Sequence, residues 1–359
     1  MIGAGVVGLS VAWWLSEHGH RVALIDPALA QGQSSNAGST AALGLLMAQL
    51  FRRSSGRGWR LRQQSLALWH SWREQLERRG HSIPLRPGLL QLAANAQEWQ
   101  AQQELVQQRQ RQGLPLRLVQ HPELETLKPA LPAAAMGGLL SPDDGQIDPI
   151  PAMEALLTDA RRQGLDTLAE PVLRIERSGA SETERWCVHT SSGQRRLSHW
   201  LVIAAGLGSP ALLAPLGHAR PQSPVLGQAL ELQLPADCNA ELWPGSISWG
   251  GINLVPRPGG LLWLGATVEP GNTTGSPEAL EELLQLGGHA PAWLQQADVV
   301  RHWQGLRARP DNRPAPLLEA LEPGLLLTSG HYRNGVLLAP ASAAWVLEQV
   351  QSSEPLPRL

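Results

Sequence analysis

Residue types that often build functional sites are scarce in this chain of 359 residues. It has two cysteines, Cys187 and Cys238, which is too few for a disulfide framework. No Cys-x-x-Cys pair and no Cys/His cluster has zinc spacing, so the sequence indicates no metal site and a reducing, cytoplasmic compartment. Lysine occurs once, as Lys128, so only one position could form a catalytic Schiff base, which disfavours a pyridoxal-phosphate enzyme.

The chain also lacks a large excess of charge of either sign and long apolar runs. The net charge is −2, and no basic excess indicates a nucleic-acid partner. No apolar run reaches the roughly 18 residues that cross a bilayer, and the apolar start lacks the basic residues and cleavage site of a signal peptide. The length suits two domains, or one large α/β domain with an insertion. The sequence leaves open whether the chain forms a homo-oligomer.

The start of the chain carries a glycine-rich pattern. Gly3, Gly5 and Gly8 form G-x-G-x-x-G, a helical stretch follows, Gly19 ends it, and a short β-rich run leads to Asp26. Glycines at this spacing allow a tight turn and close backbone approach, and a helix N-terminus offers N–H groups to a pyrophosphate. Asp26 lies where a carboxylate accepts from ribose hydroxyls. This context predicts a dinucleotide-binding unit.

The strand that should precede the glycine-rich turn is nearly absent. Only Met1 and Ile2 come before Gly3, although that strand normally lies in the middle of the sheet. We expect neighbouring strands to be left with unpaired backbone groups. We also expect the natural start to lie further upstream, and this chain to bind its nucleotide less well than a longer product.

Periodicity predicts alternating helices and strands over the rest of the chain. The helix at 59–79 is basic and amphipathic, so it suits either a membrane surface or, as we favour, a protein core. Asp148 caps a helix that ends at Gly164, and 141–149 is dense in turn residues. Further helices are predicted at 98–112 and 340–350, and strands at 88–93, 171–176, 200–205, 225–234, 246–256, 260–268 and 325–329.

Several sequence blocks together resemble one family. They are GAGVVG at the start, TAALGLL near 40–46, and then, in order, LLSPDDGQIDP, WLVIAAG, NLVPRPGGLLWLGATVEPG, WQGLRARPDNRPAP and GHYRNGVLLAP. They resemble the D-amino-acid oxidase-like family of FAD-dependent oxidoreductases, and within it the glycine oxidases of thiamine biosynthesis. The resemblance implies a Rossmann-like FAD-binding domain (1–85, 141–224 and 300–359). It also implies an inserted, antiparallel α+β substrate domain (86–140 and 225–299).

The resemblance also implies which residues contact the cofactor. We expect FAD to be bound without a covalent bond, since neither cysteine falls in a flavin-facing block. The expected contacts are the glycine-rich turn, the ribose acid, the loop beside the flavin, an adenine contact, the end of the central strand and a loop around the isoalloxazine ring. They are Gly3, Gly5, Val6, Val7, Gly8, Asp26, Pro27, Ser39, Thr40, Leu43, Gly44, Leu45, Val172, Gly206, His331, Tyr332, Arg333, Asn334, Gly335, Val336 and Leu337.

Four residues are expected to bind the substrate. The resemblance places Arg333 on the substrate carboxylate and Arg307 in the same pocket. A bidentate arginine is well suited to this, because two parallel N–H···O bonds set both position and orientation. Asn253 stands where many glycine oxidases have tyrosine, and Leu45 where some relatives have methionine. We expect no side-chain acid or base in catalysis.

Three functions agree with this pattern. The first is an oxidase acting on a small amino acid and O2, with glycine, sarcosine and small D-amino acids all open as substrates. The second is a D-amino-acid or sarcosine dehydrogenase that passes electrons to another acceptor. The third is a non-catalytic relative that only binds flavin.

Overall fold

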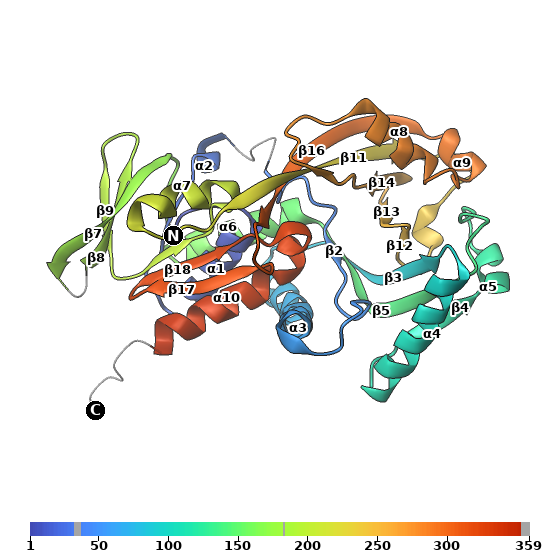
Figure 1. The fold of residues 1–359 in the computed structure, drawn as a ribbon, viewed down its shortest axis with the longest axis horizontal. Coiled ribbons are helices and arrows are strands. Elements are labelled where there is room, and N and C mark those ends of the chain that lie inside the picture. Colours follow the sequence, from blue (N-terminus) through green and yellow to red (C-terminus); the bar gives the residue numbers. More distant parts are fainter. Residues whose placement is uncertain (32–36, 182–183, 353–359) are drawn as a thin grey trace.

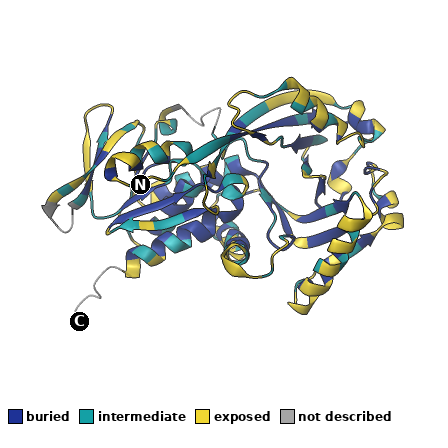
Figure 2. Cartoon of the chain, viewed as in Figure 1, coloured by how far each residue is buried: buried dark blue, intermediate teal, exposed yellow. Residues whose placement is uncertain are grey.

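The computed structural model describes residues 1–31, 37–181 and 184–352. Figure 1 shows an elongated molecule, with short strands and helices in the half that holds the N-terminus and a broad sheet in the other half. Figure 2 shows that buried positions follow the strands and helices in the interior of both halves. The α/β fold expected from the sequence is confirmed.

Short parallel strands form the sheet of the first half. β1 pairs with β6 and β10 pairs with β18, both in parallel, and β17 adds to β18 as an antiparallel edge. Their bounds are β1 (Ala23–Ile25), β6 (Asp166–Leu168), β10 (Leu201–Ile203), β17 (Leu317–Glu322) and β18 (Leu325–Ser329).

The first residues of the chain join these two pairs into one sheet. Ile2 bridges Ile25 on one side and Ile203 on the other, both in parallel. Its N–H donates to Val202 O at 2.9 Å, and Ala204 N–H donates to Ile2 O at 2.8 Å. On the other side Ile25 N–H donates to Met1 O at 3.0 Å. The expectation of unpaired backbone groups here is therefore wrong, because this short segment supplies the missing partners at the level of the glycine-rich turn.

Four helices cover this sheet with a tryptophan-rich core. Trp13, Trp69 and Trp72 are fully buried, and the rings of Trp13 and Trp72 meet edge to face at 4.8 Å between centroids. Trp69 lies on the helix that suited either a membrane or a core, so that helix packs on the core. Among the described residues, no helix is long and apolar enough to cross a bilayer. The four helices are α1 (Val6–Glu17), α3 (Gly56–Arg78), α6 (Pro149–Arg162) and α10 (Gly335–Ser352).

Asp148 caps α6 as predicted, its carboxylate accepting from Ile150 N–H at 3.2 Å. The final helix begins earlier than predicted, at Gly335. The remaining helices are α2 (Ala28–Gln31), α4 (Ala96–Arg111), α5 (His121–Thr126), α7 (Ser209–Leu213), α8 (Pro277–Gln285) and α9 (Ala292–Gln295), with 3-10 turns η1 (Gly206–Gly208), η2 (Ala214–Leu216), η3 (Ala240–Leu242) and η4 (Tyr332–Asn334).

A small antiparallel sheet projects from the first half, at the left of Figure 1. It consists of β7 (Val172–Ser181), β8 (Glu184–Thr190) and β9 (Arg195–Ser198). Ile175, Trp186 and Val188 turn inward and pack with Ile2 and Ile203. The alternation of a strand therefore sends Cys187 and His189 to the opposite face.

A ten-stranded sheet fills the second half. Its order is β15-β11-β14-β13-β12-β3-β5-β2, and β16 adds to β11 and β4 to β5. All its pairs are antiparallel except β12 with β3. The bounds are β2 (Leu45–Leu46), β3 (Leu85–Ala93), β4 (Arg117–Gln120), β5 (Gly137–Ile147), β11 (Gln222–Gln233), β12 (Ser246–Trp249), β13 (Ile252–Arg257), β14 (Leu261–Gly265), β15 (Glu269–Pro270) and β16 (Asp298–Pro310).

Two expectations for this sheet are wrong. The strand predicted at 246–256 is a hairpin, in which Trp249 pairs with Ile252 around Gly250 and Gly251. Both glycines have positive φ, 55° and 85°, as the two central residues of the tightest hairpin turn require. The turn predicted at 141–149 is mostly strand, because β5 continues to Ile147.

The irregular part of β5 holds the segment that follows β2 in place. Asp144 is fully buried, and its carboxylate accepts from the backbone N–H groups of Ala48, Gln49 and Leu50 at 2.8–3.1 Å. Burial raises the pKa of Asp144 to about 6. Turn-forming residues are therefore used here to bring a carboxylate under the segment that follows β2.

Candidate active site

The glycine-rich turn closes tightly at the end of the central segment. A Cβ on Gly3 would lie 2.5 Å from Ala204 O, and one on Gly8 would lie 1.9 Å from Gly3 O, so neither position has room for a side chain. Gly3 also has a φ of 104°. The turn delivers the chain directly to the N-terminus of α1, which has no side-chain cap at Gly5 and no acidic residue in its first turn.

Two side chains hold this turn in place. Asp26 follows β1 as predicted, and its two carboxylate oxygens accept from Ala4 N–H at 2.7 Å and Ala28 N–H at 2.8 Å. Ser39 Oγ accepts from Val6 N–H at 3.0 Å. Each carboxylate oxygen has a second lone pair, so Asp26 keeps the capacity to accept from a ribose hydroxyl. Pro27 is exposed beside it.

The segment from Ser39 to Leu45 links this turn to the large sheet. Leu43 packs against Ala229, Val255 and Trp263, and Leu45 lies beside them. Gly44 has a φ of 78°, and a Cβ there would lie 1.7 Å from Ile147 O, so only glycine fits. Thr40 Oγ1 donates to Ala37 O at 3.1 Å within the loop. The segment thus carries the chain from the start of α1 to β5.

A row of directly paired residues, most of them small, lies under this segment. Ala229, Gly265 and Asn253 are direct partners across β11, β14 and β13, and Trp303 continues the row on β16. Trp303 Nε1 donates to Ala41 O at 3.1 Å, which ties the linking segment to β16. Asn253 is buried and donates to Gly265 O at 3.3 Å. We call this mostly apolar row the floor of the candidate site.

Arg307 lies beside this floor with part of its guanidinium immobilised. Its Nη1 donates to Leu226 O and to Thr267 O, both at 3.0 Å. A Cβ on Gly227 would lie 2.1 Å from Arg307 Nη2, so the guanidinium covers that glycine. Burial, and then the positive charge of Arg333, lower the pKa of Arg307. The charge of Arg333 therefore acts on Arg307, which places the two predicted arginines in the same region.

Arg333 is exposed, and among the described residues it has no hydrogen-bond or ion-pair partner that holds its guanidinium. It belongs to η4, next to Tyr332, whose φ of 54° is uncommon for a residue with a side chain. Two cations that face one site favour an anion between them, and their forks match a carboxylate.

His331 is buried, and its side chain is bonded to a neighbouring serine. Its Nε2 lies 2.8 Å from Ser342 Oγ, which itself donates to Leu338 O at 2.8 Å. Because the hydroxyl hydrogen of Ser342 points to Leu338, Ser342 Oγ accepts a hydrogen bond from Nε2–H of His331. Burial, with a smaller effect of Arg57, lowers the pKa of His331 to about 3.

The remaining predicted cofactor residues take three different positions. Val172 begins β7, half-buried against the core around Ile2 and Ile25. Gly206 has a φ of 52°, and its carbonyl accepts from Ser329 Oγ at 3.3 Å. Asn334 ends η4. The loop predicted over 331–337 is partly helix, because Gly335, Val336 and Leu337 form the first turn of α10.

A family model described as "FAD dependent oxidoreductase" matches residues 1–349. The chain belongs to this family. It is 29% identical to a glycine oxidase of Geobacillus kaustophilus over 99% of this chain and 93% of that one. The crystal structure of glycine oxidase from that organism superposes with a TM-score of 0.86, at 29% identity, covering 99% of this chain and 94% of that one. The glycine oxidase of Bacillus cereus gives a TM-score of 0.85 at 27% identity, with 99% and 94% covered.

The residues of this FAD-dependent oxidoreductase fit the cofactor that its family implies. A glycine-lined turn without room for a Cβ, at a helix start without cap or acid, suits a pyrophosphate. Residues Gly3–Gly8, Asp26 and Ser39 would hold the nucleotide part, and the linking segment with residues 331–335 would hold the ring. When bound, FAD supplies a two-electron acceptor.

One group of polar residues behind Arg307 was not predicted. Glu269 is buried, and its Oε1 accepts from Thr267 Oγ1 at 2.6 Å and from Gln228 Nε2 at 2.9 Å. Its Oε2 accepts from Ser276 N–H at 3.0 Å. Burial alone would raise the pKa of Glu269, but these hydrogen bonds hold it below its usual range. The only signal in the sequence was a single acid within a glycine- and proline-rich block.

Proposed function

We propose that this chain is a FAD-dependent amino-acid oxidase that acts on glycine. The balanced reaction converts glycine, O2 and water to glyoxylate, ammonia and hydrogen peroxide. The observation that carries the proposal is the pair Arg307 and Arg333 beside a floor of small residues, where a carboxylate of a small substrate fits. The similarity to glycine oxidases along nearly the whole chain supports the choice of substrate.

In this proposal the two arginines have different tasks. Arg333 has a free fork and grips the carboxylate with two parallel hydrogen bonds. Nη1 of Arg307 already donates to two carbonyl groups, so this side chain is ordered before substrate binds. It therefore adds positive charge at low entropic cost. The anion also relieves the repulsion between the two guanidinium groups. Together they place the α-carbon of the substrate for oxidation.

No side chain is assigned as a general base. His331 is neutral and already donates to Ser342. The proposal therefore requires the amine of the substrate to bind in its neutral form, after it has lost a proton to water. Leu43, Leu45 and Trp263 pack together on the floor, and in this proposal they limit the size of the substrate side chain.

We also propose that FAD is held without a covalent bond. Cys187 lies on β8 in the small projecting sheet, and Cys238 packs beside the core of the second half, away from the segments assigned to the ring. Both cysteines are free, which supports a reducing, cytoplasmic compartment. Acid precipitation should release all the flavin into the supernatant. Flavin that stays in the protein pellet and colours it yellow would contradict non-covalent binding.

We propose the division into domains as expected from the sequence, with 1–85, 141–224 and 300–359 binding FAD and 86–140 with 225–299 facing the substrate. Separate apolar cores in the two halves support it. Strands β5, β11 and β16 run across the proposed boundaries.

The imine of glyoxylate, which forms before hydrolysis, would be the product used in thiazole synthesis for thiamine.

Peroxide measurement tests the proposed activity. Under air, glycine should yield hydrogen peroxide and glyoxylate in equal amounts. A dehydrogenase would instead reduce an artificial dye without air and form little peroxide, and a non-catalytic flavin-binding protein would do neither. Sarcosine, D-alanine and D-proline tested in parallel rank the substrates by kcat/KM.

A further inference from the structure

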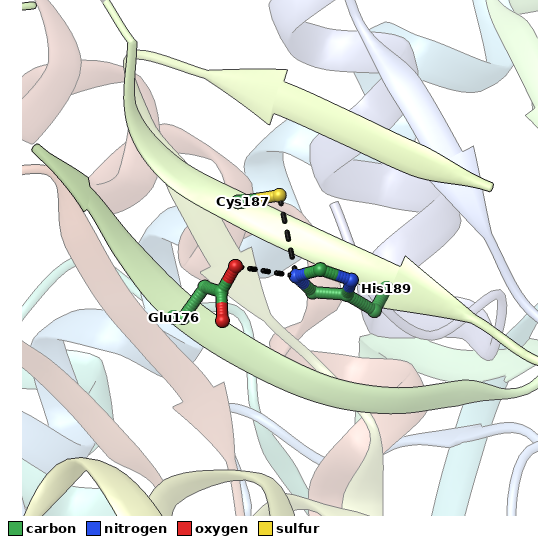
Figure 3. Close-up of side chains that lie close together, drawn as sticks. All are labelled: Glu176, Cys187 and His189. Carbon is green, nitrogen blue, oxygen red and sulfur yellow. Dashed lines mark hydrogen bonds and ion pairs between the residues drawn. The ribbon is translucent and has the colours of Figure 1, made fainter. Parts of the chain in front are cut away.

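Three potential metal ligands converge on the outer face of the small sheet. Glu176 of β7 pairs directly with Cys187 of β8, and His189 follows two residues later on the same face. Figure 3 shows the three side chains pointing toward one another from the two strands. Their donor atoms all lie within 4.8 Å of one another. Glycine-rich loops and arginines of the proposed active site take no part in this group.

The contacts in this group meet at a single nitrogen. His189 Nε2 lies 2.6 Å from Glu176 Oε1 and 3.5 Å from Cys187 Sγ. A proton relay between thiol and carboxylate would need the two different ring nitrogens. Here the one Nε2 either donates to Glu176 or accepts from Cys187. It cannot satisfy both in their ordinary protonation states. Three lone-pair donors therefore face one point, and one ring nitrogen does not complete both contacts.

We propose that Glu176, Cys187 and His189 bind a divalent cation of the zinc class, with water as the fourth ligand. Thiolate, imidazole and carboxylate are the ligands that Zn²⁺ takes in proteins. With bonds of about 2.3 Å to sulfur and about 2.0–2.1 Å to nitrogen and oxygen, a tetrahedral ion separates S from N by about 3.5 Å and N from O by about 3.3 Å. The S···N distance already has this value.

The short N···O contact requires the carboxylate to move for the ion to enter. Its oxygen must retreat from 2.6 Å to about 3.3 Å from His189 Nε2. The side chain of Glu176 is 38% exposed and that of His189 is 15% exposed, so the group opens to solvent on the Glu176 side. Cys187 is fully buried and fixed on a strand whose opposite face is core. The site thus has two fixed ligands and one adaptable ligand.

The charges around the site suit a dication bound by two anions. Glu176 and an ionised Cys187 together neutralise Zn²⁺. Arg174 Nη1 lies 3.3 Å from the second oxygen, Glu176 Oε2, and leaves Oε1 for the ion. Arg195 pairs with His189 across β9 and β8 and lies near Cys187, so a second positive charge borders the site. Such neighbours hold the ligands in position around a metal. The spacing of Cys and His along the chain did not reveal the site, because Glu176 comes from another strand.

Cobalt titration of the holoenzyme tests this site. Co²⁺ replaces Zn²⁺ and reports a thiolate ligand through a sulfur-to-cobalt absorption band, read as a difference spectrum against the same flavoprotein without metal. We expect one equivalent to saturate, Zn²⁺ to displace it, and the band to disappear in Cys187→Ser. Cys238→Ser, which changes the half-buried cysteine elsewhere, is the matched control and should keep the band.

Two further variants keep the test decisive if Cys187→Ser does not fold. Glu176→Gln and His189→Gln should each weaken Zn²⁺ binding by at least about tenfold in calorimetry, with FAD content unchanged. No saturable binding would overturn the proposal. A cobalt band that persists in Cys187→Ser, or unchanged Zn²⁺ affinity in both further variants, would also overturn it.

Discussion

Arg307 covers Gly227 so closely that a Cβ on the glycine would lie 2.1 Å from Nη2 of the arginine. Gly227 lies within β11 and its φ is not positive, so alanine suits its backbone. The obstacle is therefore the guanidinium, which two carbonyl groups hold in place. This contact makes the position of Arg307 testable without changing Arg307 itself.

Gly227→Ala should displace Arg307 and raise KM for glycine by about tenfold or more, corresponding to about 1.4 kcal/mol of lost binding. The bound FAD should stay, because Gly227 takes no part in the contacts of the glycine-rich turn with Asp26 and Ser39. Steady-state kinetics with the flavin spectrum as a check measure both. Gly58→Ala on α3, where a new Cβ would make only an ordinary contact with Phe51 at 3.8 Å, is the control. An unchanged KM in Gly227→Ala would place Arg307 outside the substrate site.

Glu269→Gln should weaken substrate binding indirectly. The new amide group would face donors from Thr267, Gln228 or Ser276 in place of an oxygen, so one buried group would lose its partner. Thr267, whose carbonyl holds Arg307, would then shift. We expect KM to rise more than kcat falls, and the free energy of unfolding to drop by about 1–3 kcal/mol. Glu281→Gln, exposed on α8, should change neither quantity.

The buried His331 should make the protein less stable in acid. Its folded pKa is about 3, below its usual 6.5, so the unfolded chain binds more protons between these values. Stability is then fully present above pH 6.5 and falls as the pH is lowered toward 3. At pH 5 this loss amounts to about 2 kcal/mol.

His331→Gln keeps a hydrogen-bond donor and removes the titration. The difference between parent and variant in urea unfolding should shrink by about 2 kcal/mol between pH 7 and pH 5. Comparing the two also cancels Asp144, whose raised pKa acts with the opposite sign below pH 6. The same change at the exposed His18 serves as the control. Equal pH dependence of parent and His331→Gln would show that His331 is not buried in neutral form.

Local patterns were sufficient to predict the parts of the fold that rest on local rules. The cap at Asp148, the strand Leu325–Ser329 and the helix start after Gly5 each follow from residue patterns within a few positions. The hairpin at Gly250 and Gly251 was missed because apolar residues continue on both sides of it. Strand β5 was missed because its turn-forming residues are needed for Asp144, whose partners lie about 95 residues earlier in the chain.

The candidate site divides in the same way. Asp26, Arg307 and Arg333 could be predicted because they stand in recognisable blocks. Glu269 was missed because its role depends on partners from β11 and the loop before α8, which only the fold brings together. The three ligands on the small sheet were missed for the same reason.

The most direct test of the proposed function is an anaerobic mixing experiment with glycine, with loss of the oxidised flavin absorption as the signal. The parent should bleach fully at saturating glycine. Arg333→Ala should contain the same amount of FAD and need roughly a hundredfold more glycine, because it lacks the free guanidinium that grips the carboxylate. If the parent does not bleach with glycine, or Arg333→Ala bleaches at the same glycine concentration as the parent, the proposed function of this site is contradicted.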